Sequence, residues 1–227
     1  VRIAVSDALP TNTTISFSTA APRIDLNNFN QTIRGLIHVG TNVGGVIRTG
    51  LGAGGTLTIS DLGLTNTFRG QIVENGRLVK TGPGSLQLGG VNTITNGVSV
   101  QQGELRLIAT TTLANNPSNT ILVTNGAQLA FANINAMAAN HGTQLLSPII
   151  VAGSTILCDG KENRLGNVTL NGGTMLFNGG SAIWGAFYLP ETVSVVGASA
   201  SIITNTALLN GTLRPGFNST FAVDDVT

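Results

Sequence analysis

The sequence predicts an all-β fold, a right-handed parallel β-helix (β-solenoid) of roughly eight to ten coils. Residues 1–227 are expected to form a single solenoid domain. Three observations predict this fold: a composition that suits strands and tight turns, a ten-residue pattern that recurs along the chain, and Asn-Gly steps between strand-like stretches. In a solenoid each coil contacts mainly its neighbours, so the core runs as a column along the axis.

The composition favours strands over helices, because Val, Ile, Thr and Gly are abundant. Hydrophobic residues make up 41% of the chain, charged residues only 9%, and the net charge is +1. Disordered chains have the opposite composition, with low hydrophobicity and high net charge. The eleven Lys and Arg residues are scattered without a basic run, which argues against nucleic acid as a partner.

A ten-residue pattern recurs with apolar residues at its first, third, eighth and tenth positions and a small residue at the sixth. The clear copies are VSVQQGELRL from Val98, IIVAGSTILC from Ile149, VTLNGGTMLF from Val168 and VSVVGASASI from Val193. Weaker copies are LVTNGAQLAF from Leu122 and TALLNGTLRP from Thr206, while GGTLTI from Gly54 and ENGRLV from Glu74 match only its second half. The starts at Leu122, Ile149, Val168 and Val193 lie 27, 19 and 25 residues apart, which is about one coil of a β-helix.

This pattern predicts which side chains face the core. Two short strands with alternating apolar residues cannot bury themselves alone, whereas stacked coils pair strand on strand and share one core. The inward positions that we expect to be buried in one column are Val100, Leu105, Val151, Ile156, Leu170 and Met175.

The Asn-Gly steps are predicted to form corners of the coils, because Asn and Gly tolerate positive φ. They occur at Asn75, Asn125, Asn171 and Asn210. The same step between two alternating runs is also a hairpin signal, so a sandwich of antiparallel strands is the alternative fold. The spacing of the repeats favours the solenoid.

The two ends of the chain, residues 1–20 and 216–227, are candidate terminal strands that pair with or cap the solenoid. Both are strand-like and carry few charges, so copies are expected to associate end to end through them. No apolar run is long enough to span a bilayer. Because Val1-Arg2-Ile3 does not open a signal peptide, the sequence is expected to be the mature form of a protein exported by a bacterium.

Residues 78–107, LVKTGPGSLQLGGVNTITNGVSVQQGELRL, resemble the autotransporter-associated β-strand repeat. The likeness lies in the Lys80-Thr81-Gly82 step, in Asn92-Thr93 and in the glycines that precede alternating Leu or Val pairs. The segment departs from the repeat at Ile94, where an aromatic residue is common, and at Asn96, where a second glycine often stands. The resemblance implies a secreted or surface-exposed bacterial passenger domain with a β-helix fold, acting in adhesion or as a stalk.

No catalytic, cofactor-binding or metal-binding residue is predicted. The acidic residues are few, and no carboxylate pair recurs at the coil spacing, as a polysaccharide-cleaving β-helix would need. The run from Asp159 to Arg164 is interpreted as a solvated loop with internal ion pairs rather than a calcium or sugar site. His38 and His141 lack partners at metal spacing and are expected at surface or turn positions, and Cys158 is expected to be a small buried side chain.

The aromatic residues Trp184, Phe187 and Tyr188 form a cluster and are candidates for contacts with a glycan or a protein partner. The alternative is that this segment is an insertion that packs over a coil. The function expected from these observations is a non-catalytic extracellular structural protein, either a β-helical surface module or a self-assembling fibre subunit. A glycan- or cell-binding adhesin is the second hypothesis, and a polysaccharide-active enzyme is the third.

Overall fold

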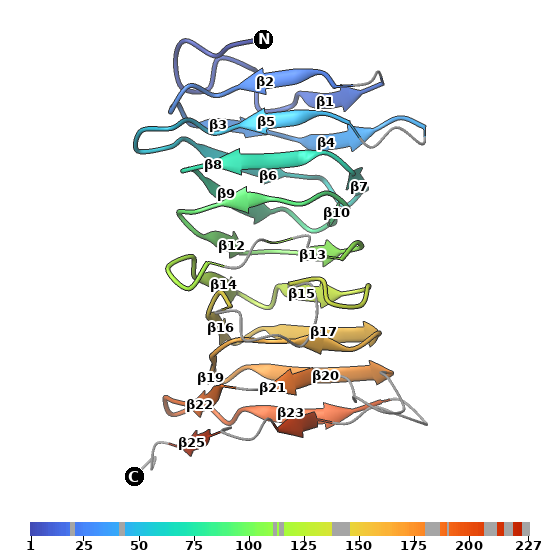
Figure 1. The fold of residues 1–227 in the computed structure, drawn as a ribbon, viewed down its shortest axis with the longest axis vertical. Helices are drawn as coiled ribbons and strands as arrows, with labels where there is room; N and C mark the ends of the chain where they lie inside the picture. Colours follow the sequence, from blue (N-terminus) through green and yellow to red (C-terminus); the bar gives the residue numbers. More distant parts are fainter. Residues whose placement is uncertain are drawn as a thin grey trace.

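The chain forms a parallel β-solenoid, as the sequence predicts (Figure 1). The computed structural model describes residues 1–18, 21–40, 44–110, 113, 116–137, 146–179, 187–189 and 191–206, together with the strands at 213–215 and 220–223. Every strand pairing in these residues is parallel, and they contain no helix. The antiparallel sandwich is thereby excluded.

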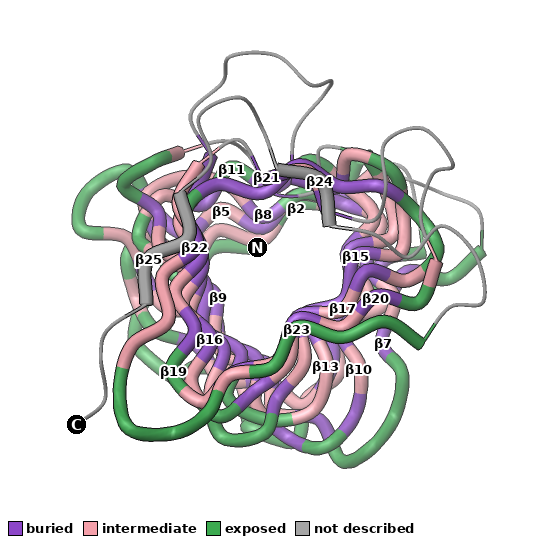
Figure 2. The backbone as a smooth tube through the Cα atoms, turned by 90° about the horizontal axis from the view of Figure 1, so that it is seen from below, coloured by how far each residue is buried: buried purple, intermediate pink, exposed green. Residues whose placement is uncertain are grey.

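Three sides enclose the core when the molecule is viewed along its axis (Figure 2). The first side is a nine-stranded sheet of β3 (Gln31–Ile33), β6 (Thr56–Ser60), β9 (Arg77–Thr81), β12 (Val98–Val100), β14 (Ile121–Thr124), β16 (Ile149–Ala152), β19 (Val168–Asn171), β22 (Thr192–Val195) and β25 (Thr220–Val223). The second side contains a seven-stranded sheet of β7 (Thr65–Phe68), β10 (Ser85–Leu88), β13 (Glu104–Leu107), β15 (Gln128–Phe131), β17 (Thr155–Gly160), β20 (Thr174–Gly179) and β23 (Ile202–Asn205).

The remaining strands complete the coils. The pair β1 (Thr14–Phe17) and β4 (Gly35–His38) forms a two-stranded sheet, and β4 also contacts β7 of the second side. The third side consists of a four-stranded sheet of β2 (Arg23–Asp25), β5 (Val46–Arg48), β8 (Gln71–Glu74) and β11 (Thr93–Ile94), and a three-stranded sheet of β18 (Asn163–Arg164), β21 (Phe187–Leu189) and β24 (Leu213–Pro215). The solenoid has about seven turns, slightly fewer than the eight to ten predicted, because some coils are long: Ile121 pairs with Ile149, 28 residues further on.

The inward column follows the predicted pattern. Val100, Leu105, Val151, Ile156, Leu170 and Met175 are each 0% exposed. Their neighbours in sequence are only partly buried along most strands, which gives the alternation seen in β6, β10 and β17. Parallel pairing stacks apolar side chains of successive coils on one another, for example Leu86 on Leu105 and Leu105 on Leu129. These side chains therefore form one continuous core.

Two copies of the ten-residue pattern are displaced from their predicted register. Val98 pairs with Ile121 rather than Leu122, since the corner of that coil holds one more residue than the pattern allows. Thr174 pairs with Ile202, so Ile203 rather than Ala200 continues the column of Met175. The copy from Thr206 lies mostly outside the described residues.

The half-matches upstream belong to the first side and not to the second. The pattern assigned GGTLTI and ENGRLV to its second half. The strands in them are β6 and β9, and both belong to the nine-stranded sheet, where β6 pairs with β9 and β9 pairs with β12. A glycine followed by an alternating strand occurs at more than one corner of the coil. This local signal therefore does not specify which side of the solenoid the strand joins.

The first residues of the chain cover the edges of β2 and β3. The backbone of Asp25 bonds to both Val1 and Ile3, at 2.9 and 2.8 Å. Gln31 points inward and is 1% exposed, and its side-chain amide accepts from the Leu9 N–H and donates to the Leu9 carbonyl oxygen, at 3.0 and 2.9 Å. These contacts satisfy backbone groups that an uncovered sheet edge would expose.

A cation lies inside the column. Lys80 occupies an inward position of β9, is 0% exposed and forms an ion pair with Asp61, with 2.6 Å between Nζ and Oδ2. Removing one partner of such a pair leaves a buried charge uncompensated, which costs about 3–5 kcal/mol. The lysine of the Lys80-Thr81-Gly82 step is therefore a core residue.

Replacing Leu170 by Asp is expected to abolish folding, because it buries a carboxylate in an apolar column. The cost of several kcal/mol is comparable with the roughly 5–15 kcal/mol by which domains are stable. Thr169→Asp is the matched control, since Thr169 lies next to it on the outward face. Circular dichroism and thermal melting of both variants test the register, and a folded Leu170→Asp protein that melts like the parent would show it to be wrong.

Candidate functional site

The corner between the third side and the first side, where β2, β5, β8 and β11 lead into β3, β6, β9 and β12, is rich in asparagine. We call its residues 26–30, 49–55, 74–76 and 95–97 the asparagine corner. Asn27 and Asn28 have φ of 52° and 68°, in the left-handed region that Asn tolerates better than most residues. Glu74 also has a positive φ, 84°, so in this coil the left-handed residue precedes the predicted Asn75.

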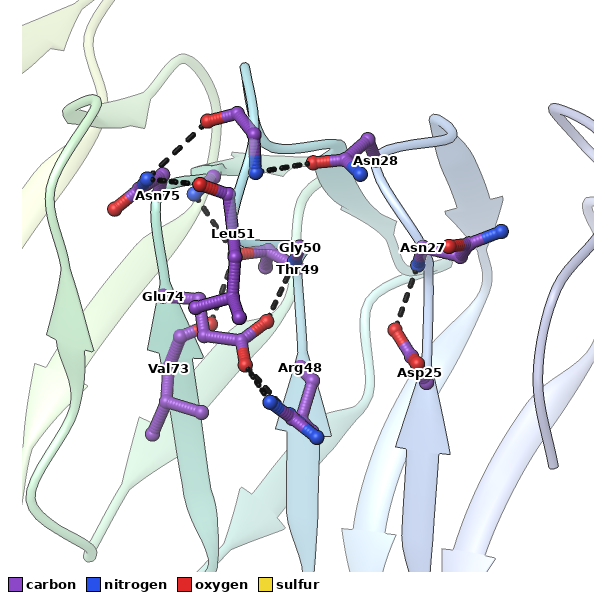
Figure 3. A network of polar contacts seen from close by, with 12 residues as sticks. Asp25, Asn27, Asn28, Arg48, Thr49, Gly50, Leu51, Val73, Glu74 and Asn75 are labelled. Carbon is purple, nitrogen blue, oxygen red and sulfur yellow. Dashed lines mark hydrogen bonds and ion pairs between the residues drawn. The ribbon is translucent and has the colours of Figure 1, made fainter.

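Asparagine amides join successive coils at this corner. Asn28 Oδ1 accepts from the N–H groups of Gly52 and Gly54, at 3.0 and 3.1 Å. Asn75 Nδ2 donates to the carbonyl oxygens of Leu51 and Gly52, at 2.7 and 3.2 Å (Figure 3). The side chains thus supply hydrogen bonds where the strand ladder is interrupted.

A cleft of 330 Å³ opens at the end of the asparagine corner that lies nearest to β2. It is lined by Arg2, Asp25, Asn27, Asn28, Arg48, Gly50, Leu51, Gly52 and Glu74. Glu74 is bound by the Arg48 guanidinium, with 2.5 Å between Nη2 and Oε1, and accepts from the Gly50 N–H at 2.8 Å (Figure 3). Asp25 accepts from the Asn27 N–H at 2.8 Å and lies 3.6 Å from Arg2.

The cleft combines fixed polar groups with exposed ones. The carboxylates of Asp25 and Glu74 are held by neighbouring donors, whereas the Arg2 side chain is 70% exposed and Leu51 is 71% exposed. Amide, guanidinium and carboxylate groups beside an aliphatic side chain can bind a hydroxyl-rich ligand by hydrogen bonds and apolar contact. A second cleft, of 380 Å³, lies further along the same corner and is lined by Arg77, Thr95, Asn96, Gly97, Val98, Ser118, Thr120 and Leu122.

Composition and periodicity did not identify this corner as a site. A usable signal was present, because Asn27-Asn28 and the glycine-rich loop before β6 lie about one coil apart. The ten-residue pattern is defined by apolar and small residues and therefore does not include the polar side chains that connect the coils.

The three aromatic candidates do not form one surface in the described residues. Phe187 is 0% exposed and packs edge-on against Phe131 and Phe177, each with 5.5 Å between ring centroids. Its side chain belongs to the core, so it is not available for contact with a glycan or a protein partner. Tyr188 is half-buried, and Trp184 lies outside the described residues.

Two further interpretations of polar residues need correction. His38 is 8% exposed and packs against both Phe17 and Phe68, at ring-centroid distances of 5.4 and 5.0 Å, so it is not a surface residue. Its alternation with buried Leu36 makes it an inward residue of β4. His141 lies outside the described residues.

The polar run that begins at Asp159 is not a solvated loop. Asn163 is 0% exposed, and Glu162 and Arg164 are 6% and 5% exposed. Asp159 bonds to Arg106, two coils away along the second side, instead of pairing within its own loop. Strand β18 places part of this run on the third side, where it is covered by neighbouring coils.

Within the part of the chain that the structure describes, no three His, Cys, Asp or Glu residues are grouped so that they could hold a metal ion. The same residues contain no helix of the length and apolarity required to cross a membrane.

The fold and the asparagine corner define a class of protein: a parallel β-solenoid whose corners are held by amide side chains. Among known proteins, the chain is similar to the adhesin BmaC autotransporter of Brucella suis biovar 1 (strain 1330), with 29% identity over 233 residues. That alignment covers 87% of this chain but only 6% of the adhesin, so the chain spans a small part of its relative's length. No family model matches the sequence, and no solved structure matches it.

The thiol of Cys158 is expected to be unreactive in the folded protein. Burial raises its pKa to about 12, and Sγ donates to the Lys161 carbonyl oxygen at 2.7 Å. At pH 8 a thiol with that pKa is ionised in roughly one molecule in ten thousand, and the thiolate is the reactive form. Labelling with an aromatic disulfide reagent should be slow in buffer and fast in denaturant. Rapid labelling of the folded chain would contradict the buried position.

Proposed function

We propose that this chain is a non-catalytic structural segment of a bacterial adhesin exposed at the cell surface or secreted. The similarity to an autotransporter adhesin and the solenoid fold support the proposal. We also propose that residues 78–107 are a repeat of the autotransporter-associated β-strand type. In the structure this segment contains β9 to β13, with Gly82, Gly97 and Gly103 at positive φ.

The main support for a structural role comes from the bonding partners of the carboxylates. Asp61 binds Lys80, Glu74 binds Arg48, and each pair joins neighbouring coils. On the second side Glu104 accepts from Ser85 Oγ at 2.6 Å, and Asp159 bonds to Arg106. A general acid or base must be free to exchange a proton with a substrate, whereas these groups are committed to contacts that hold coils together.

A second proposal concerns adhesion itself. The two clefts of the asparagine corner suit a glycan. The cleft nearest to β2 offers amide and guanidinium groups beside the exposed Leu51, and the second cleft offers Arg77 and Asn96 beside Leu122. Trp184 and Tyr188 remain candidates for a separate contact, for which Tyr188 lies on β21 of the third side.

Binding of the purified chain to a glycan array and to host cells tests both surfaces. The variant Arg2→Ala with Leu51→Ala should lower binding at least tenfold if the corner is the site, and Trp184→Ala with Tyr188→Ala should do so if the aromatic segment is. Leu62→Ala is the control, since Leu62 is 73% exposed and lines neither cleft of the asparagine corner. A parent that binds neither glycans nor cells would remove the adhesive role, and turnover on a polysaccharide panel would overturn the non-catalytic one.

End-to-end association is a third proposal. Among the described strands, β1 is paired with β4 and β23 with β20, and each is the last strand of its sheet. Ile202 and Ile203 of β23 are 53% and 41% exposed, although Ile203 continues the inward column. A second copy that paired β1 with β23 would extend the sheet and cover Ile203, and repetition of this contact would give a fibre.

The variant Ile203→Lys is expected to abolish self-association, because it would place a cation in the newly buried position. Ile134→Lys, at an apolar residue that is 40% exposed and follows β15 in the middle of the solenoid, should leave association unchanged. Light scattering as a function of protein concentration and electron microscopy provide the readout. A parent that stays monomeric at high concentration, or an Ile203→Lys protein that still forms fibres, would refute the proposal.

A further inference from the structure

The buried pair of Lys80 and Asp61 has the geometry of two reactants. Nζ and Oδ2 lie 2.6 Å apart, and the two side chains are 0% and 1% exposed. They come from successive coils of the first side, since Ser60 pairs with Thr81 in the ladder between β6 and β9. Water therefore has little access to the pair, and the backbone fixes the relative position of both groups.

Backbone groups bind the other polar atoms of the pair. Oδ1 of Asp61 accepts from the N–H groups of Gly84 and Gly63, at 2.5 and 3.0 Å. Two N–H donors aimed at one carboxyl oxygen polarise the carbonyl and would stabilise negative charge that develops on it. Nζ of Lys80 donates to the carbonyl oxygens of Thr81, Gly82 and Gln102, at 3.0, 2.7 and 3.2 Å, which hold it against Asp61.

We propose that Lys80 and Asp61 condense to an intramolecular isopeptide bond that covalently joins two successive coils. Burial lowers the pKa of the Lys80 amine, and this opposes the raising effect of the Asp61 charge. Desolvation thus favours the neutral amine, which is the nucleophile. The bond would be a modification of this chain that does not depend on any ligand.

The condensation is balanced without a co-reactant. A proton passes from the Lys80 ammonium to Oδ2, giving an amine and a carboxylic acid. The amine nitrogen attacks Cγ of Asp61, and charge develops on Oδ1, which the Gly84 and Gly63 N–H groups bind. Oδ2 then leaves as water with a second proton from Nζ. One C–N bond forms, one C–O bond breaks, and no group is oxidised or reduced.

Two effects favour this reaction over condensation in solution. Reactants held in contact behave as though present at about 10⁵–10⁸ M. The product is neutral, so it also eliminates two charges from a site where they are poorly solvated. The three carbonyl oxygens around Nζ act in the opposite direction, because they bind the ammonium form. The chemical outcome is therefore either the amide or a persistent ion pair, and the two differ in mass.

Intact-mass spectrometry of the purified, denatured chain distinguishes these outcomes. The proposal expects a mass lower than the sequence mass by one water molecule. Trypsin should fail to cleave after Lys80, and the digest should contain the peptide of residues 49–69 joined to the peptide of residues 78–106. The full sequence mass, together with cleavage after Lys80, would overturn the proposal.

Two variants serve as controls. Lys80→Arg retains the cation but lacks a primary amine, so it should show its full sequence mass. Asp61→Asn retains an acceptor oxygen and an amide leaving group, so it should lose one molecule of ammonia instead of water. If either variant fails to fold, the mass and the digest of the parent still decide the question. A loss of water that persisted in Lys80→Arg would place the bond elsewhere and contradict the proposal.

Discussion

The structure depends on one constraint: in a parallel ladder, each residue lies directly over its equivalent in the next coil. An inward leucine in one coil therefore places the equivalent residue of the following coil inside the core, which favours an apolar side chain there. The column from Leu86 through Leu105 and Leu129 to Ile156 and Met175 meets this requirement on the second side. Because a shift of one residue would turn the apolar set outward, the register is strongly specified.

The corners can vary as long as they return the chain to this register. Between β14 and β15 the turn holds an extra residue, with Asn125 and Gly126 both at positive φ, and the next strand still pairs correctly. Gly76 is needed for a different reason, since a Cβ there would lie 2.3 Å from the Gly55 carbonyl oxygen. Glycine thus appears at corners both for backbone conformation and for close packing between coils.

The fold class and the inward residues of the central coils could be predicted from the sequence, because periodic apolar residues carry the signal that register requires. Leu170 and Met175 were found in this way, whereas Ile203 was missed because a corner of variable length precedes it. Polar residues inside the fold, such as Lys80 and His38, follow from contacts between coils that no local pattern records. The asparagine corner was missed for the same reason: its amides bond to residues about one coil away.

A chain with few charges can still use several of them to hold its coils together. The outward face of the first side, by contrast, is stabilised by uncharged side chains. Its central ladder runs from Thr32 and Thr58 through Val79, Ser99 and Leu122 to Ile150, Thr169 and Ser194, without a charged residue. Side-by-side Thr, Val and Ile side chains stabilise parallel strands by packing alone. Arg48 on the third side and Arg106 on the second side each connect one coil to another, and Lys80 does so from the inward face of the first side.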